Sequence, residues 1–200
     1  MGWLSEDLNL SMQQQQQTEW CWAATATSVN LFYNPNSDLT QCWLVTVTFI
    51  FYWQNANLKP AESTSDVCSG PLSASSNIPW GLQNYPTAPS PLQLAGNNYA
   101  KDFGGPDSWS GLVTQIAMGQ PECVEIEWSG GGSHYVAIDG FTEWIKPPWL
   151  PPSPFPVPSQ DFMVHIEDPV YGPSDVVFSV FKTAYQGQGS WSWTVYSQAG

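Results

Sequence analysis

The sequence predicts an α+β fold in which a mainly helical part, residues 13–105, packs on a mainly β part, residues 106–200. An alanine-rich stretch free of glycine and proline lies near the start of the chain, which is typical of a helix. Short runs of β-branched and aromatic residues bounded by turn residues dominate the second half, which predicts an antiparallel sheet or a small barrel. With 200 residues, of which 42% are hydrophobic, the chain can bury a core of its own, and we expect one domain.

The first half contains two long candidate elements. Residues 20–33 predict a helix with Thr18 as N-cap and Glu19 in its first turn, ended by "NPNSD". Residues 39–53 predict a buried element, for which we slightly favour a helix, although "TVTFIFYW" also suits a strand. Residues 59–103 are rich in Ser, Pro, Asn and Gly, so we expect mostly loop with one short helix near Leu82.

The second half opens with a short amphipathic helix in "PDSWSGLVTQIAMGQP", capped by Asp107 or Ser108. Four strands are then expected, in "CVEIEW", "HYVAIDGF", "FMVHIEDP" and "SWSWTVY". Between the second and third of them, Pro147–Pro158 predicts an extended polyproline-type spacer rather than a docking peptide.

Charge excludes several function classes. The chain has 17 acidic residues against four lysines and no arginine, with a formal net charge of -13, so we expect no nucleic acid partner and no anionic membrane surface. The longest apolar run, "WLVTVTFIFYW", is too short to span a bilayer. We therefore expect a soluble protein, and its composition suits an extracellular setting even though "MGWLSEDLNLSM" shows no signal peptide.

The four cysteines form no CxxC pair and have no histidine at metal-ligand spacing, so we expect neither a zinc site nor another cofactor. Cys123 lies in an apolar strand and is interpreted as a core residue. Cys42 and Cys68 could pair, but their positions do not decide it. Cys21 lies in the first turn of a predicted helix, where backbone N–H groups stabilise a thiolate. Its position alone suits a core residue as well as a nucleophile.

A thiolate nucleophile needs a base, and the chain has only two histidines. His134 follows "SGGGS" and opens a strand, which suits an imidazole at the edge of a cleft, whereas His165 is interpreted as a structural or surface residue. Asp168 ends a strand before a proline and is the favoured group to orient the imidazole. Asp139 and Glu167 are competitors, although Asp139 belongs to the same strand as His134.

The order Gln, Cys, His, Asp, together with "WCWAA", "TQC", "GGSHYVAIDGF" and "EDPVYGPSD…Y…G…W", resembles the bacterial papain-like cysteine proteases, and among them the secreted effector proteases of plant pathogens. The resemblance covers roughly residues 13–41 and 119–196. It implies a hydrolase that acts on proteins or peptides, with a cleft between a helical and a β half. It also implies that Cys21 is the nucleophile, His134 the general base and later acid, Asp168 the orienting residue and Gln15 the oxyanion donor.

Two features depart from that family: the apolar "WLVTVTFIFYW" after "TQC", and the long proline-rich insert. Both features bear on substrate specificity and activity. Two other functions stay open on separate grounds. The same residues suit acyl transfer to an amine, as in transglutaminase-like enzymes. Alternatively, the 12 tryptophans and the low charge suit a non-catalytic binding or self-assembling module. The sequence does not predict the oligomeric state.

Overall fold

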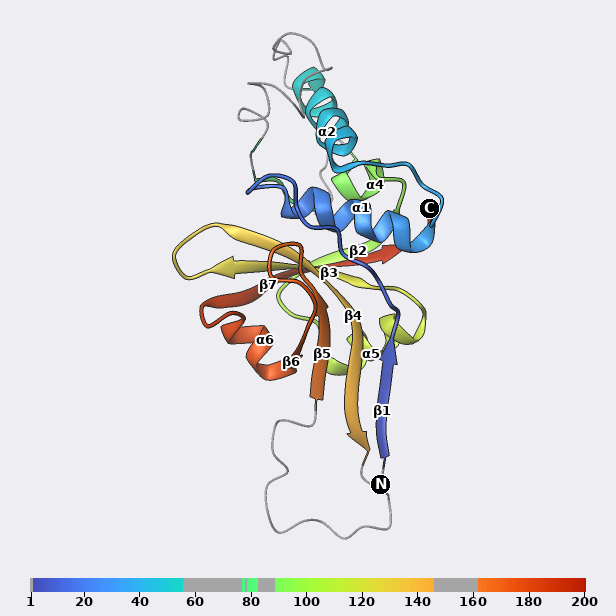
Figure 1. The fold of residues 1–200 in the computed structure, drawn as a ribbon. Coiled ribbons are helices and arrows are strands. Elements are labelled where there is room, and N and C mark those ends of the chain that lie inside the picture. The colour runs from blue at the N-terminus through green and yellow to red at the C-terminus, as the bar shows by residue number, and fades with distance from the viewer. Residues whose placement is uncertain (1, 56–76, 78, 83–88, 146–161) are drawn as a thin grey trace.

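The computed structural model describes residues 2–55, 77, 79–82, 89–145 and 162–200 (Figure 1). Its elements in chain order are β1 (Gly2–Asp7), α1 (Cys21–Tyr33), α2 (Gln41–Asn55), α4 (Pro91–Leu94), β2 (Asn98–Gly104), α5 (Trp109–Ala117), β3 (Glu122–Trp128), β4 (Ser133–Ile145), β5 (Phe162–Glu167), β6 (Ser174–Val177), α6 (Phe178–Ala184) and β7 (Gly189–Gln198). The predicted α+β class is confirmed.

The strands form one seven-stranded antiparallel sheet in the order β2-β7-β3-β4-β5-β6. The first half of β4 pairs with β3, and β1 pairs with the second half of β4, from Gly140 to Ile145. The sheet is open, with β2 and β6 at the two ends of this order. The small barrel that the sequence also allowed is therefore wrong.

Helices cover both faces of the sheet, and the alternation of side chains along each strand divides the core in two. On the face covered by α1, α2 and α4, the buried side chains of the sheet include Cys123, Tyr135, Ala137 and Val195. On the other face, covered by α5 and α6, they include Val124, Ile126, Val136, Ile138 and Trp191. The sheet is thus the middle layer of the domain, as Figure 1 shows.

The two long helices are confirmed, and the second is a helix rather than a strand. Leu44, Val45, Thr48 and Phe49 of α2 are buried at the i, i+1, i+4, i+5 spacing of one helix face. The predicted cap of α1 is wrong. Trp20 is its N-cap and makes no side-chain capping hydrogen bond, while the Thr18 hydroxyl accepts a hydrogen bond of 2.8 Å from Asn77.

The amphipathic helix of the second half is confirmed as α5, with Ser108 as its N-cap. The expected short helix of the middle region is α4, which begins after a capping box of Ser90 and Gln93, whereas Leu82 lies in a buried loop. All four predicted strands exist, as β3, β4, β5 and β7. The spacer predicted at Pro147–Pro158 lies outside the described residues.

Strands β1, β2 and β6 and helix α6 were not predicted. β1 has no run of β-branched residues, and its pairing with β4 joins segments more than a hundred positions apart in the sequence. Such long-range pairing leaves little local signal. Within the described part of the chain, no helix is both long and apolar enough to cross a membrane.

Candidate active site

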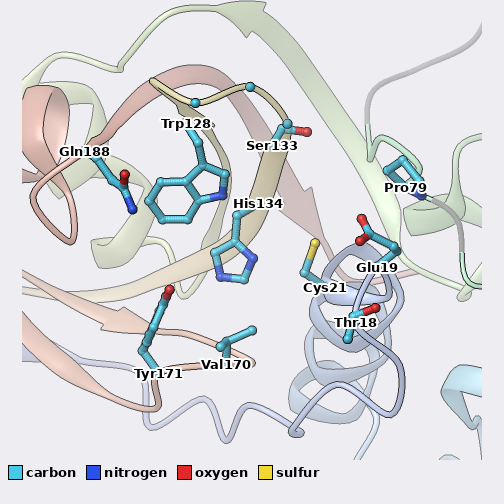
Figure 2. Close-up of a pocket in the computed structure, with 13 residues that line it drawn as sticks. Thr18, Glu19, Cys21, Pro79, Trp128, Ser133, His134, Val170, Tyr171 and Gln188 are labelled. Atoms are coloured by element: carbon cyan, nitrogen blue, oxygen red, sulfur yellow. The ribbon is translucent and has the colours of Figure 1, made fainter.

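Cys21 is the first residue of α1 and is 7% exposed. Helix α1 packs on β4, and the Thr25 hydroxyl donates a hydrogen bond of 3.2 Å to the Tyr135 carbonyl. Because Tyr135 directly follows His134, this contact fixes the start of α1 against the strand that carries the histidine. Cys21 and His134 line one cavity of about 510 Å³, and in Figure 2 their side chains lie next to each other.

The His134 ring contacts both of its predicted partners. Its Nε2 lies 3.0 Å from each carboxylate oxygen of Asp168, and the Cys21 side chain is close enough to the ring to raise its pKa. The ring nitrogen that remains for the thiol is Nδ1, which faces Cys21 in Figure 2. The structure therefore brings together three of the four residues selected from the sequence.

Asp168 is held by more than the histidine. Its Oδ1 accepts hydrogen bonds from the backbone N–H groups of Val170, at 2.7 Å, and Tyr171, at 2.9 Å. Its Oδ2 accepts a hydrogen bond of 2.8 Å from the phenol of Tyr185. The backbone bonds come from the turn that Pro169 begins, which is the turn predicted for "EDPVYG". Asp168 is 2% exposed, so this set of donors fixes an ionised carboxylate in a buried place.

The electrostatics of the pair follow from these contacts. Burial alone would lower the pKa of His134, but its hydrogen bonds to Asp168 and Cys21 and their negative charges raise it to about 9. Burial alone would raise the pKa of Asp168, but the hydrogen bond from His134 and the backbone donors hold it below its usual value. The arrangement therefore favours a protonated imidazole beside an ionised aspartate at neutral pH.

Aromatic rings surround the imidazole. The Trp128 ring stacks on His134, with centroids 5.9 Å apart and planes at 23°. Trp128 also stacks on Tyr185, and Tyr171 presents its edge to His134 at 6.2 Å. Trp128 comes immediately before the tight turn from β3 to β4, in which Gly131 and Gly132 adopt positive φ values of 91° and 87° that favour glycine. These rings limit the access of water to the contact between His134 and Asp168.

Gln15 lies near the candidate triad, but its side chain is not in the position expected of an oxyanion donor. Its backbone N–H donates a hydrogen bond of 3.1 Å to the Pro169 carbonyl, so the glutamine run lies beside the turn that holds Asp168. Its side-chain amide, however, donates a hydrogen bond of 2.8 Å to the Thr18 carbonyl, and Gln15 does not line the cavity. An oxyanion role for Gln15 would use the second N–H of this amide and would require the side chain to reach the cavity.

Gln41, the glutamine of "TQC", forms hydrogen bonds with the glutamine run at residues 13–17. Its buried amide donates hydrogen bonds to the Gln13 side chain and the Gln14 carbonyl and accepts one from the Gln16 backbone. Ser28 of α1 accepts a further hydrogen bond of 2.8 Å from the Gln13 backbone. Hydrogen bonds with Ser28 of α1 and Gln41 of α2 therefore hold Gln13, Gln14 and Gln16 in place.

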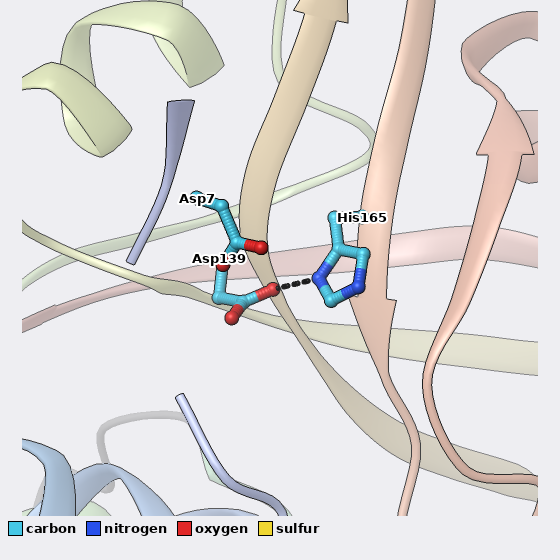
Figure 3. A group of neighbouring side chains, drawn as sticks. All are labelled: Asp7, Asp139 and His165. Carbon is cyan, nitrogen blue, oxygen red and sulfur yellow. Dashed lines mark hydrogen bonds and ion pairs between the residues drawn. The ribbon is translucent and has the colours of Figure 1, made fainter. Parts of the chain in front are cut away.

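The other histidine pairs with the competing aspartate. His165 Nδ1 lies 2.6 Å from Asp139 Oδ1, and Asp7 lies beside them, with one ligand atom of each residue within 4.8 Å of the others (Figure 3). This is a group of described residues whose atoms are close enough to hold a metal ion. Asp139 already bonds His165 and accepts a hydrogen bond of 2.9 Å from the Leu10 backbone, so we interpret the group as an anchor for the N-terminal segment.

The remaining cysteines divide as follows. Cys123 is fully buried, as predicted for a core residue, and burial raises the pKa of its thiol to about 12. Cys42 forms a disulfide, and Cys68 lies outside the described residues. Cys21 is thus the free thiol that reaches the cavity among the described residues.

Three residues of the site escaped the sequence analysis. Trp128 stacks on His134, Tyr185 bonds Asp168, and Glu19 lines the cavity instead of lying inside the helix. The spaced pattern "Y…G…W" contains Tyr185 and gives a signal for it, but that pattern assigns it no partner. Neither Trp128 nor Glu19 carries a comparable signal, because the chain has 12 tryptophans and an acidic surface.

No protein-family model matches this chain, and no curated protein matches its sequence. Function is therefore inferred from the site itself. The arrangement of a thiol, an imidazole and a buried carboxylate suits nucleophilic catalysis at a carbonyl group.

Proposed function

We propose that the protein is a papain-like cysteine endopeptidase in which Cys21, His134 and Asp168 form the catalytic triad. The observation that supports this most directly is that one imidazole contacts both the Cys21 side chain and the two oxygens of a buried aspartate, at 3.0 Å. The position of Cys21 at the start of a helix adds to it, because the N–H groups of a first helical turn favour negative charge.

The proposed reaction proceeds in two steps. The Cys21 thiolate attacks the carbonyl carbon of a peptide bond and forms an S–C bond, while the carbonyl oxygen takes up the negative charge. The intermediate then collapses, the C–N bond breaks, and His134 gives its proton to the leaving amine. Water attacks the resulting thioester and gives one proton to His134, which releases a carboxylic acid and restores the thiolate and imidazolium.

Asp168 and the oxyanion donors support these steps without forming bonds to the substrate carbon. Asp168 keeps the imidazole oriented and stabilises its charge. The Cys21 backbone N–H lies at the helix start, where it can donate to the developing oxyanion, and Gln15 joins it if its side chain moves so that an amide N–H reaches the cavity. We propose the Gln15 role with that rearrangement as its condition.

The proposal is tested by incubating the protein with a mixture of unmodified peptides and identifying the products by mass spectrometry. We expect cleavage by the wild type, none by Cys21→Ala or His134→Ala, and retained cleavage by Cys123→Ala as the matched cysteine control. Cleavage that survives in Cys21→Ala would refute the proposal, because the thiol would then not be the nucleophile.

The same experiment separates hydrolysis from acyl transfer. In heavy-oxygen water, hydrolysis places the label in the new carboxyl terminus of each product. A labelled primary amine present in the mixture is incorporated instead if the thioester transfers its acyl group to amines. We expect the oxygen label to dominate.

A non-catalytic, self-associating module is the second candidate, and exposed aromatic side chains favour it. Trp3 on β1 is 60% exposed and Trp43 on α2 is 50% exposed. Light scattering over a range of concentrations tests this candidate. Assembly that Cys21→Ala leaves unchanged and that Trp3→Ala or Trp43→Ala weakens, in a protein without peptidase activity, would support it over the enzyme.

A further inference from the structure

Glu19 occupies a fixed place beside the thiol. It lines the same cavity as Cys21 and His134, and in Figure 2 it lies on the far side of Cys21 from the histidine, next to Pro79. Its backbone N–H donates a hydrogen bond of 2.9 Å to Asn77, whose amide in turn donates to the Thr18 hydroxyl. The loop that leads into α1 is therefore tied down just where it presents Glu19 to the cavity.

Among the described residues, no lysine forms an ion pair with the Glu19 carboxylate. Within the described residues it accepts no hydrogen bond and joins no ion pair, and its side chain is exposed. The described lining of the cavity contains no lysine or arginine and no other carboxylate. The whole chain has four lysines and no arginine. In the described lining, the group that can carry positive charge is the His134 imidazole, which is paired with Asp168.

Apart from Glu19 and His134, the described lining of the cavity is apolar or uncharged. Trp128 and the exposed side chains of Val170 and Tyr171 form the wall on the sheet side, and the wall near the β3–β4 turn consists of glycines and Ser133. A substrate bound across Cys21 therefore meets the Glu19 carboxylate, which no described cation compensates, on the side of the thiol opposite the histidine. Fixed charge in a cleft with low-dielectric walls attracts the opposite charge and repels its own.

We propose that Glu19 selects substrates with a lysine or arginine side chain close to the scissile bond. This inference rests on the proposed peptidase function and names the substrate class for the same site. A basic side chain that reaches Glu19 forms a charge-assisted hydrogen bond with it, whereas an acidic side chain in the same place is repelled by Glu19 and finds no described cationic partner.

The test is a cleavage-site profile. A synthetic peptide mixture with all residue types around varied bonds is digested by the wild type, Glu19→Gln, Glu19→Lys and Glu6→Gln, and the cut bonds are read by mass spectrometry. Glu6 on β1 is exposed and does not line the cavity, so Glu6→Gln makes the same change in net charge as Glu19→Gln outside the site. kcat/KM is then measured on a matched pair of peptides that differ by Lys and Gln at the selected position.

We expect lysine and arginine to be enriched at one position beside the cut bond in the wild type and in Glu6→Gln. Glu19→Gln should lower the preference for the Lys peptide over the Gln peptide by about ten-fold, and Glu19→Lys should shift it toward acidic residues. The wild-type preference should also weaken as salt is added, because an exposed charge is screened.

Two results would overturn the inference, and they are distinguishable. Cleavage without basic enrichment, or with an enrichment that Glu19→Gln leaves intact, removes the role of Glu19 and leaves the peptidase function standing. A wild-type protein that cleaves no peptide of the mixture removes the peptidase function and the inference with it.

Discussion

The phenol of Tyr185 donates a hydrogen bond of 2.8 Å to Asp168 Oδ2, the oxygen that also faces His134 Nε2 at 3.0 Å. Tyr185 is 1% exposed and sits between elements: it follows α6 and pairs with Gly189 at the start of β7. Its ring packs against Trp128 and Phe181. The Tyr185 hydroxyl therefore connects the core on the α6 side of the sheet with Asp168 of the candidate triad.

Replacing Tyr185 with Phe should remove that hydroxyl and keep the ring packing. We expect kcat for peptide hydrolysis to fall about ten-fold with KM little changed, because Asp168 loses one of its fixed donors and orients His134 less well. Tyr33→Phe is the matched control, since the Tyr33 hydroxyl bonds Ser197 away from the cavity. Equal kcat values for Tyr185→Phe and the wild type would show that the hydroxyl has only a structural role.

The pH profile should report the pair of His134 and Asp168. Since the pKa of His134 is raised to about 9, the imidazolium that protonates the leaving amine is lost only as the pH rises through about 9, and kcat/KM should fall there. Asp168→Asn removes one of the two negative groups that raise this pKa, so the alkaline limb should move down toward the ordinary histidine value of about 6.5. An alkaline limb that stays in place in Asp168→Asn would contradict this assignment. The profile is read from initial rates on one peptide substrate.

Glu122 on β3 should make stability depend on pH. Its side chain is fully buried, and burial together with the nearby Asp107 raises its pKa well above the usual value. The unfolded chain loses this proton at about pH 4.5 while the folded chain keeps it, so folding stability falls as the pH rises above about 4.5. Glu122→Gln should therefore be more stable than the wild type at pH 8, by about 1–3 kcal/mol, with the gain shrinking toward pH 4.

Chemical denaturation at the two pH values measures this difference. Glu127→Gln is the matched control, because Glu127 lies exposed on the same strand. A gain in stability that is equal at pH 4 and pH 8 would mean that the carboxyl group of Glu122 is not the cause.

Gly189 should not tolerate a side chain, because it lies against the Trp128 ring that stacks on His134. A Cβ atom at Gly189 would lie 2.5 Å from Ile126 Cγ2 and 2.7 Å from Trp128 Cζ3. Gly189→Ala should therefore cost about 1–3 kcal/mol of folding stability and displace Trp128 from its stack on His134. Gly130→Ala is the control, since a Cβ atom there meets no atom of the described residues within 4 Å. Thermal unfolding with tryptophan fluorescence measures both effects, and similar melting temperatures for the two variants would contradict the crowding argument.

The sequence predicts correctly those elements whose structure is determined by residues within one short segment. Helix α1 follows from the run of alanines, and α5 from its cap at Ser108 and its amphipathic spacing. The turn at Asp168 follows from Asp-Pro, and its backbone donors account for the position of the carboxylate. Cys21, His134 and Asp168 were selected because each has a local setting that suits its role, and the structure brings them together.

Other parts depend on contacts between distant segments. Only the pairing of β1 with β4 brings Asp7 next to Asp139, and only the neighbouring strands β4 and β5 bring Asp139 to His165. The same holds for Tyr185 and Asp168, and for Trp128 above His134. The predicted cap of α1 is wrong for the same reason. The Thr18 hydroxyl accepts a hydrogen bond from Asn77, which is distant in the sequence, and does not cap the helix. Gln15 was selected from a resemblance, which cannot anticipate the hydrogen bond of its amide to Thr18.

The most direct test of the proposed thiol chemistry is the alkylation rate of Cys21 by iodoacetamide at pH 6, measured by intact mass and peptide mapping in the wild type and in His134→Ala. If an imidazolium holds Cys21 as a thiolate, Cys21 should be the labelled residue, at least about ten-fold faster than in His134→Ala, with Cys123 unmodified. Labelling of Cys21 that is slow, or equally fast without His134, would contradict a thiolate held by His134 and with it the proposed peptidase.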